Sequence, residues 1–300
     1  MSDPLVIVRT VHIAACVVAL GTVAFAAIAD RPARGAPEWM ALERGYRGLA
    51  AAALAIAVLS GAVWLVLVAR NILDVSLGDL FTQGGLGTVA VDTRFGRVAC
   101  LRLLLALAAA ATVPFPRLHW LRLMTAAALT GSLAWTGHAG AGTGVTGDLH
   151  LGSDILHLLA AGLWLGALPA LVLLLRWGRD DPDRGLIAAA VTRRFSLLAL
   201  ISVAILTGTG IANSLILVGW PADLLATAYG RVLALKVALF GGMLGLAAFN
   251  RYRLTPVLPA ANALRALTMT VAAETALGAG ILLLVGLLGT LPPASHLHIS

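Results

Sequence analysis

Residues 148–168 read DLHLGSDILHLLAAGLWLGAL, an apolar run that carries His150, Asp154 and His157 near its start. These three residues are spaced four and three positions apart, so on a helix they share one face. Apolar residues continue to about position 175, and a helix that crosses a bilayer needs about 20 residues of this kind. The stretch therefore predicts a membrane helix with a polar face near one of its ends.

The composition of the whole chain is that of an integral membrane protein. Of its 300 residues, 60% are hydrophobic and 12% are charged, whereas soluble proteins carry about a quarter charged residues. The net charge of +7 does not indicate a nucleic-acid partner, because excess arginine in membrane proteins usually lies in cytoplasmic loops. The expected partner is the lipid bilayer. Cys16 and Cys100 both lie in apolar runs, and we expect no disulfide.

Eight apolar runs are long enough to cross a bilayer. Prolines and glycines, which interrupt helices, separate them. The first run lacks a basic leader, which favours an uncleaved membrane helix over a signal peptide. The predicted fold class is an all-α polytopic membrane protein with eight transmembrane helices. The predicted spans are 5–28, 48–69, 98–114, 119–136, 151–175, 195–217, 232–250 and 266–291.

The basic residues between the spans predict the orientation. The first, third, fifth and seventh connecting segments together hold 13 lysines and arginines, whereas the other connections and both termini hold 4. Because basic loops remain in the cytoplasm, we expect both termini to lie outside, in the periplasm or at the cell exterior. The segment 137–150 and the C-terminal tail then face the same side.

The two halves of the chain resemble each other at three ordered landmarks. His12 and Gly21 are nine residues apart, and so are His157 and Gly166. The other two matches are Arg47 to Gly61 with Arg194 to Gly208, and 93–102 with 227–236. Each half has four spans, an even number, so the copies share one topology. We therefore predict two parallel four-helix repeats, residues 1–146 and 147–300, related by a pseudo-twofold axis along the membrane normal.

Six polar residues from four predicted spans fall at one depth in the membrane. At 1.5 Å per residue they lie within roughly 12 Å of the outer ends of their helices, and charged residues at such depth are candidates for function. They are Arg9, His12, Arg102, Asp154, His157 and Lys236. Glu274 lies deeper, near the middle of the last span. The adjoining outer surface carries His138, His150, His296 and His298.

The face formed by His150, Asp154 and His157 suits a divalent transition metal, because imidazole and carboxylate on one helical face can chelate copper, nickel, zinc or iron. The alternative is structural. In that interpretation His150 lies among the lipid headgroups and Asp154 pairs with Lys236 or Arg102.

A second kind of site is suggested by the matched positions of His12 and His157. Two histidines that face each other across a pseudo-twofold axis can be axial ligands of haem b, with Arg9, Arg102 or Lys236 meeting its propionates. The alternative is that each histidine bonds a neighbouring helix and fixes packing. Gly241 and Gly245 form a small-xxx-small pattern that predicts close helix packing.

Several short patterns along the second half resemble the copper-resistance D (CopD) family. They are His157-Leu-Leu-Ala-Ala-Gly-Leu-Trp164-Leu-Gly166, Arg194-Phe-Ser with Leu206-Thr-Gly208, Tyr229-Gly-Arg231 with Lys236, Asn250-Arg251-Tyr-Arg253-Leu-Thr-Pro256, and Glu274. The first half resembles the family in topology and in His12. The resemblance implies a bacterial inner-membrane protein of about eight spans, linked to copper uptake or resistance and often working with a small periplasmic copper-binding protein. The pattern of His157, Trp164 and Gly166 is also similar to that of membrane proteins of haem metabolism.

Three functions are compatible with these features. The first is a non-enzymatic protein that moves copper inward from the outer face. Its outer binding site would comprise His138, His150, His296 and His298, and its intramembrane site His157, Asp154 and His12. The second is a haem-binding or redox protein that reduces Cu(II), and the third is a docking protein for a periplasmic copper chaperone. The sequence leaves the oxidation state of copper and the oligomeric state open.

Overall fold

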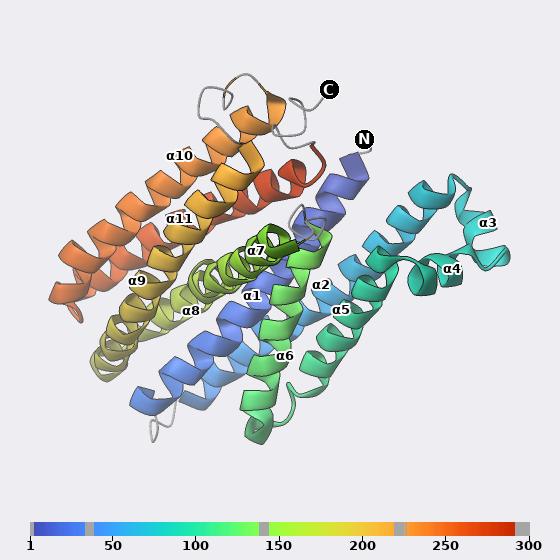
Figure 1. Cartoon of the computed structure of the whole chain (residues 1–300). Coiled ribbons are helices and arrows are strands. Elements are labelled where there is room, and N and C mark those ends of the chain that lie inside the picture. Colours follow the sequence, from blue (N-terminus) through green and yellow to red (C-terminus); the bar gives the residue numbers. More distant parts are fainter. Residues whose placement is uncertain (1–2, 34–38, 138–143, 219–224, 226, 292–300) are drawn as a thin grey trace.

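Every regular element in the part of the chain that the structure describes is helical (Figure 1). The computed structural model describes residues 3–33, 39–137, 144–218, 225 and 227–291. The long helices are α1 (Asp3–Ala33), α2 (Trp39–Leu73), α5 (Arg94–Ala111), α6 (His119–Gly131), α7 (Gly144–Trp164), α8 (Leu168–Gly178), α9 (Pro182–Val218), α10 (Ala228–Phe249) and α11 (Ala261–Leu288). The predicted all-α class is confirmed.

Six helical segments are long and apolar enough to cross a membrane: 4–30, 39–73, 144–178, 182–217, 228–257 and 261–288. The other two predicted spans correspond to α5 and to α6 with the 3₁₀ turn η2 (Ser132–Thr136). They fall short because α5 carries three arginines in 18 residues and α6 has only 13 residues. The structure therefore confirms a multi-pass helical protein with six candidate spans.

The connection between α2 and α5 contains two short helices, α3 (Leu77–Thr82) and α4 (Gly85–Asp92). Ser76 caps α3 by accepting a hydrogen bond from the Asp79 amide, and Thr93 caps α5 in the same way through the Gly96 amide. Figure 1 shows this pair of helices projecting at one side of the bundle.

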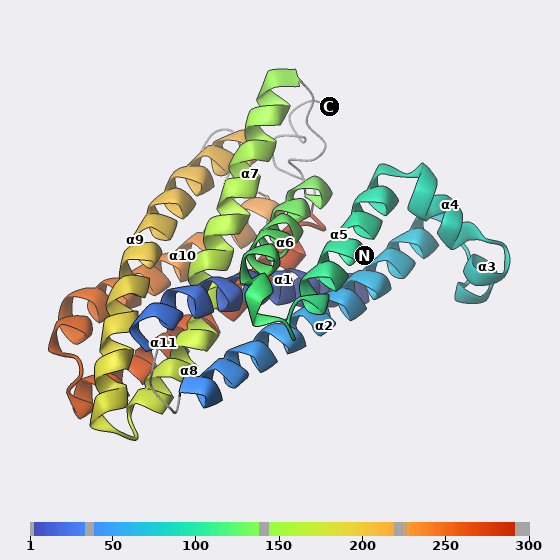
Figure 2. The ribbon, with the colours of Figure 1, turned by 90° about the horizontal axis from the view of Figure 1, so that it is seen from below.

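Helix α1 lies at the centre of the molecule and joins its two hydrophobic cores. Its residues 13–19 pack with α2, α5 and α6, whereas Phe25 and Ala29 pack with α2, α8, α9 and α11. Figure 2 shows α1 passing through the middle of the bundle. Two-thirds of its apolar window is buried, against 17% for α9 and 11% for α10. A helix that is apolar all round is suited to this central position.

At its centre α1 meets the 3₁₀ turn η4 (Leu165–Ala167) with backbone against backbone. A Cβ atom added to Gly21 would overlap the backbone of Gly166 and Ala167, and one added to Gly166 would overlap the Val17 carbonyl. Gly162 also has no room for a side chain, because the Leu20 side chain lies 2.6 Å from where its Cβ would be. Glycine is therefore required on both sides of this contact.

The predicted span 151–175 is not one continuous α-helix, because η4 separates α7 from α8. Pro169 is the second residue of α8 and has no backbone N–H to donate to Leu165. The expectation that Gly241 and Gly245 mark close helix packing is wrong, because nothing lies within 4 Å of where their Cβ atoms would be.

The glycine contact predicts the effect of adding single methyl groups. Gly21→Ala and Gly166→Ala should each destabilise the protein by at least about 2 kcal/mol, because overpacking against backbone cannot be relieved by a side-chain rotation. Gly245→Ala, in open space on α10, is the matched control and should be neutral or slightly stabilising. The measurement is the thermal unfolding midpoint in detergent. Equal midpoints for Gly166→Ala and Gly245→Ala would show that the contact is not tight.

Candidate functional site

His12 is completely buried on α1 and is held by α2. Its Nδ1 atom lies 3.0 Å from the Ala57 carbonyl oxygen and 3.1 Å from Ser60 Oγ. A carbonyl oxygen can only accept a hydrogen bond, so Nδ1 carries the proton and donates. The lone pair of the neutral ring is therefore on Nε2, the nitrogen that is left for a ligand.

Cys16 lies one helical turn beyond His12 on the same face of α1. Its Sγ atom is 3.8 Å from His12 Nε2, and the cysteine is fully buried. Cys16 is not among the site residues predicted above, although its position four residues after His12 places it on the same helix face. Imidazole nitrogen and cysteine sulfur together form a donor pair that suits soft metal ions.

Trp64 on α2 is surrounded by three of the predicted site residues. The guanidinium carbon of Arg9 lies 5.6 Å from its ring centroid and that of Arg102 lies 5.3 Å away. The His12 ring meets the indole edge-on at 5.5 Å. Such contacts stabilise a cation against an aromatic face. A narrow crevice lies here, lined by His12, Gly61, Trp64, Phe95, Ala99, Arg102 and Leu103.

The two arginines are held by neutral oxygens. Arg102 donates to the Ser132 hydroxyl and carbonyl at 3.2 and 3.1 Å, and to the Thr136 hydroxyl at 3.1 Å. Arg9 donates to the Gly289 carbonyl at 2.7 Å and thereby ties the start of α1 to the end of α11. Arg102 is therefore hydrogen-bonded to η2. The ion pair with Asp154, one of its two expected roles, is not formed.

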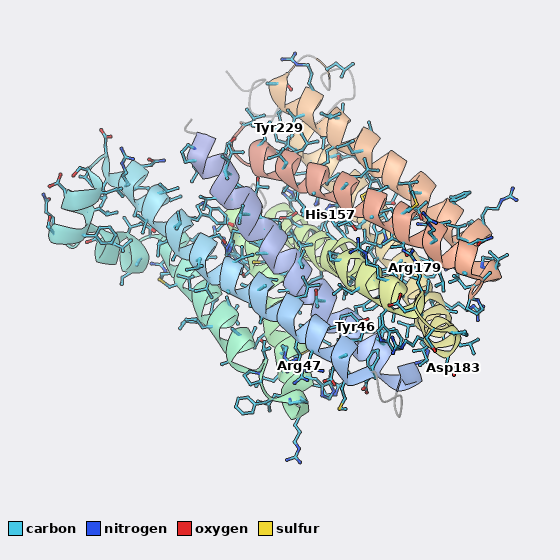
Figure 3. All side chains as sticks on the ribbon, turned by 180° about the vertical axis from the view of Figure 1, so that it is seen from behind. Tyr46, Arg47, His157, Arg179, Asp183 and Tyr229 are labelled. Carbon is cyan, nitrogen blue, oxygen red and sulfur yellow. The ribbon has the colours of Figure 1, made fainter. Side chains whose placement is uncertain are left out.

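His157 on α7 repeats the arrangement of His12. Its Nδ1 atom lies 2.9 Å from the hydroxyl of Thr209 on α9, and that hydroxyl donates to the Ile205 carbonyl at 2.6 Å. Since Thr209 has one proton to give, its oxygen accepts from His157, and Nδ1 is again the protonated nitrogen. In both halves a histidine thus donates from Nδ1 to the next long helix and keeps Nε2 unprotonated. Figure 3 shows His157 toward the Tyr229 end of the bundle, away from Arg179 and Asp183.

Asp154 lies one turn before His157 and is attracted by two cations. Lys236 of α10 and Arg9 of α1 both act on it electrostatically. No ion pair within 4.0 Å joins Asp154 to a described cation. The Asn213 amide approaches its carboxylate at 3.5 Å. The expected pairing of Asp154 with Lys236 is thus a longer-range attraction. The second cation that acts on Asp154 is Arg9 and not Arg102.

The remaining predicted residues are dispersed. His150 is buried on the first half of α7, two turns before His157. His138, His296 and His298 lie outside the described residues. Within the described ranges, no three His, Cys, Asp or Glu side chains come together as a metal-binding group. His150, Asp154 and His157 therefore share a helix face without forming a closed coordination shell.

The haem arrangement also requires His12 and His157 to share one space. His157 is absent from the residues that line the crevice beside His12. His12 Nε2 contacts the Cys16 sulfur, and His157 is hydrogen-bonded to Thr209. Each histidine therefore bonds a neighbouring helix, as the structural alternative expected.

Three other predicted residues lie deeper in the bundle than the histidines: Trp164, Gly166 and Glu274. Trp164 is buried and meets Phe240 edge-on at 6.1 Å, and Gly166 forms the contact with α1. Glu274 on α11 is buried in a second pocket that also includes Trp164.

These features define a multi-pass helical membrane protein with buried histidines and arginines near one end of its bundle. Residues 189–288 match the family model of copper resistance protein D, and residues 1–148 match that of the copper resistance protein D-like N-terminal domain. Copper resistance protein D of Pseudomonas syringae pv. tomato is 31% identical over 277 residues, covering 87% of this chain and 88% of that protein. The chain belongs to the copper resistance protein D family.

Two other relatives are similar to parts of the chain. Inner membrane protein YebZ of Escherichia coli (strain K12) is 30% identical over 77% of this chain and 82% of its own length. Copper transport protein CutJ of Bacillus subtilis (strain 168) is 34% identical over 53% of this chain, which corresponds to 28% of that longer protein. No solved structure matches the chain.

The hydrogen bonds of the two Nδ1 atoms predict which ring nitrogen carries the proton in His12 and His157. Nitrogen NMR of histidine-labelled protein should show both His12 and His157 with the proton on Nδ1. Thr209→Val should alter the His157 signals, because it removes the oxygen that accepts from Nδ1. Ser60→Ala is the matched control and should leave His12 as Nδ1–H, because the Ala57 carbonyl remains. An unchanged His157 spectrum in Thr209→Val would contradict the assignment.

Proposed function

We propose that this protein moves copper inward across the bacterial inner membrane, without enzymatic chemistry, through donors at the histidine end of the bundle. Family membership and the names of its relatives, two of which are copper resistance and copper transport proteins, support a role with copper. The name of the Escherichia coli relative supports the inner membrane as its location.

The observation that carries this proposal is the state of the two matched histidines. In metal sites a ligating histidine usually donates its other ring N–H to a protein oxygen, which fixes the ring and its tautomer. His12 and His157 are both fixed in this way. The Cys16 sulfur lies within hydrogen-bonding distance of His12 Nε2, and a sulfur ligand favours Cu(I) over harder ions.

The arginines near His12 do not prevent copper binding. A cysteine ligand must lose its proton, so binding of Cu⁺ to the Cys16 thiol releases one H⁺ and leaves the net charge of the site unchanged. Arg102, which interacts electrostatically with Cys16, therefore faces no added positive charge. Asp154 supplies the anionic group on the His157 side, where it offsets Lys236.

The finer architecture also belongs to this proposal. We infer eight crossings, with α5 and α6 completing the six longer spans, both termini in the periplasm, and two parallel repeats. The contact of Gly21 with Gly166 supports the repeat arrangement, because residues matched between two halves meet each other when they lie near a twofold axis. The matched Nδ1 contacts of His12 and His157 support it as well.

The outer histidines remain the proposed first binding site. His150 lies at the beginning of the helix that carries Asp154 and His157, so copper accepted there would be one or two turns from the intramembrane donors. His138, His296 and His298 would act with it, either directly or by receiving copper from a small periplasmic copper-binding protein. The absorption spectrum of the purified protein distinguishes this function from haem binding, since a Soret band lost in His12→Ala or His157→Ala would establish the latter.

The donor assignment predicts a contrast between the two cysteines. Cys16→Ser should lower Cu(I) affinity by about tenfold or more, and His12→Ala and His157→Ala should sharply reduce copper uptake into proteoliposomes. Cys100→Ser is the matched control, because Cys100 is the other cysteine of the chain and is half-buried on α5. Binding is measured by competition with a Cu(I) chelator. Copper uptake at the wild-type rate in both histidine variants would contradict the assignment of these histidines to the transport site.

A further inference from the structure

A second polar pocket lies deeper in the bundle than the histidine layer, toward the opposite end. Its interior offers about 50 Å³, enough for a small ion or a water molecule. Asn250, one of its lining residues, follows Lys236 by 14 residues on one helical rod, roughly 21 Å at 1.5 Å per residue. The pocket is lined mainly by α8, α9, α11 and the helix that follows α10. No function proposed above uses it.

Glu274 supplies the one carboxyl group of this pocket. It is 2% exposed, and its Oε1 atom accepts a short hydrogen bond from the Asn250 amide. The Asn250 oxygen accepts from the Thr270 hydroxyl at 2.6 Å, which fixes the orientation of the amide. Oε2 of Glu274 makes no hydrogen bond to any described residue. One oxygen of a buried carboxyl group is thus left for a ligand.

Thr192 on α9 supplies a second free oxygen to the same pocket. The residue is 3% exposed, and its hydroxyl has no hydrogen-bond partner in the described chain. More than nine in ten buried polar groups are satisfied. A buried, unpartnered hydroxyl on the wall of a pocket therefore indicates a ligand that it would contact.

The backbone beside Glu274 is distorted in a way that turns polar groups into the pocket. Asn250–Leu254 (η6) form a π-helix, a conformation that occurs often at functional sites. The Thr255 hydroxyl donates to the Asn250 carbonyl at 2.9 Å, which satisfies that oxygen within the wider turn. As a result the successive residues Asn250 and Arg251 both line the pocket.

Arg251 does not neutralise Glu274 directly. Its guanidinium donates to the Ser196 carbonyl at 2.9 Å and to the Ser196 hydroxyl at 2.6 Å. No ion pair within 4.0 Å joins it to Glu274. The carboxylate charge therefore remains for another cation, and the nearby guanidinium favours a monovalent cation over a divalent one.

We propose that Glu274 and Thr192, with Asn250 orienting the carboxyl group, form a binding site for a monovalent hard cation, a proton or Na⁺, separate from the copper donors. Carboxylate and hydroxyl oxygens are hard ligands, and no His, Cys or Met is among the described residues that line this pocket. The two cations exchange at one carboxyl group: Na⁺ binding to the protonated acid releases H⁺. The site goes beyond the proposed copper function and does not depend on it.

Few other charges act on this carboxyl group. Arg251 is the single charged residue besides Glu274 among those that line the pocket. On the helices packed against α11, Arg9 of α1 bonds Gly289, 15 residues beyond Glu274, and Lys236 of α10 interacts with Asp154. Arg253 of η6 and Arg176 of α8 are not lining residues. The cation occupancy of Glu274 should therefore be governed mainly by its own ligands and Arg251.

The test is infrared spectroscopy of the purified full-length protein in bilayers, with buffer exchange between low and high pH in Na⁺-free choline buffer. The wild type should show the carbonyl band of a protonated carboxylic acid, and this band should disappear as the pH rises. The isosteric Glu274→Gln should lack the band, whereas Asp154→Asn, the matched control at the other end, should keep it. Addition of Na⁺ at fixed pH then identifies the ligand: loss of the band shows Na⁺ competition, and an unchanged band shows a site for the proton alone.

The variant Thr192→Val tests the same site while Glu274 is kept. It removes the free hydroxyl and keeps the side-chain shape, so the apparent affinity for the cation should change about threefold to tenfold. Spectra of Glu274→Gln identical to the wild type, or an unaltered affinity in folded Thr192→Val, would overturn the proposal. Cu(I) binding by Cys16→Ser is measured independently, so failure of this site and failure of the copper proposal are distinguishable.

Discussion

The backbone contact between Gly21 of α1 and Gly166 of η4 is the constraint on which the rest of the structure depends. It lets two helices approach more closely than any side chain would allow. The approach places α1 between the two hydrophobic cores. His12 and His157 each lie nine residues before their glycine, so one crossing point sets the depth of both rings. A pocket on the other side of the crossing is bounded by Trp164 and Leu168.

The buried cations are stabilised by neutral oxygens more than by acids. Arg102 is bonded to Ser132 and Thr136 and stacks on Trp64, and Arg9 is bonded to a carbonyl at the end of α11. Charge inside a membrane is costly unless it is satisfied by hydrogen bonds or counter-charges. Because hydroxyl and carbonyl oxygens satisfy these arginines, Asp154 and the Cys16 thiol are not consumed by ion pairing. That leaves them as the ionisable groups that the proposed copper site would use.

The sequence predicted the features that arise from composition and periodicity. The all-helical class, the multi-pass topology, the family and the burial of His12 follow from apolar length and local motifs. It did not predict the break at Leu165–Ala167, because one proline in an apolar run can either kink or continue a membrane helix. It also offered Arg102, beside Lys236, as a partner of Asp154, since opposite charges suggest pairing while the hydroxyls of Ser132 and Thr136 give no comparable signal. The proximity of Cys16 to His12 and the free oxygen of Thr192 depend on rotamers and packing that spacing alone does not fix.

The distribution of ligand atoms along the bundle argues for two different ions at its two ends. Nitrogen and sulfur atoms of His12, Cys16 and His157 gather at one end, whereas Glu274, Thr192 and Asn250 place only oxygen and amide groups at the other. Soft and hard ions prefer these two sets respectively. The two ends share the rod formed by α7 and α8, on which His157 precedes the pocket residue Trp164 by seven residues, roughly 10 Å. A shift of this rod against Gly21 would move a copper donor and a wall of the cation pocket together, so the glycine contact is the place at which occupancy of one end would affect the other.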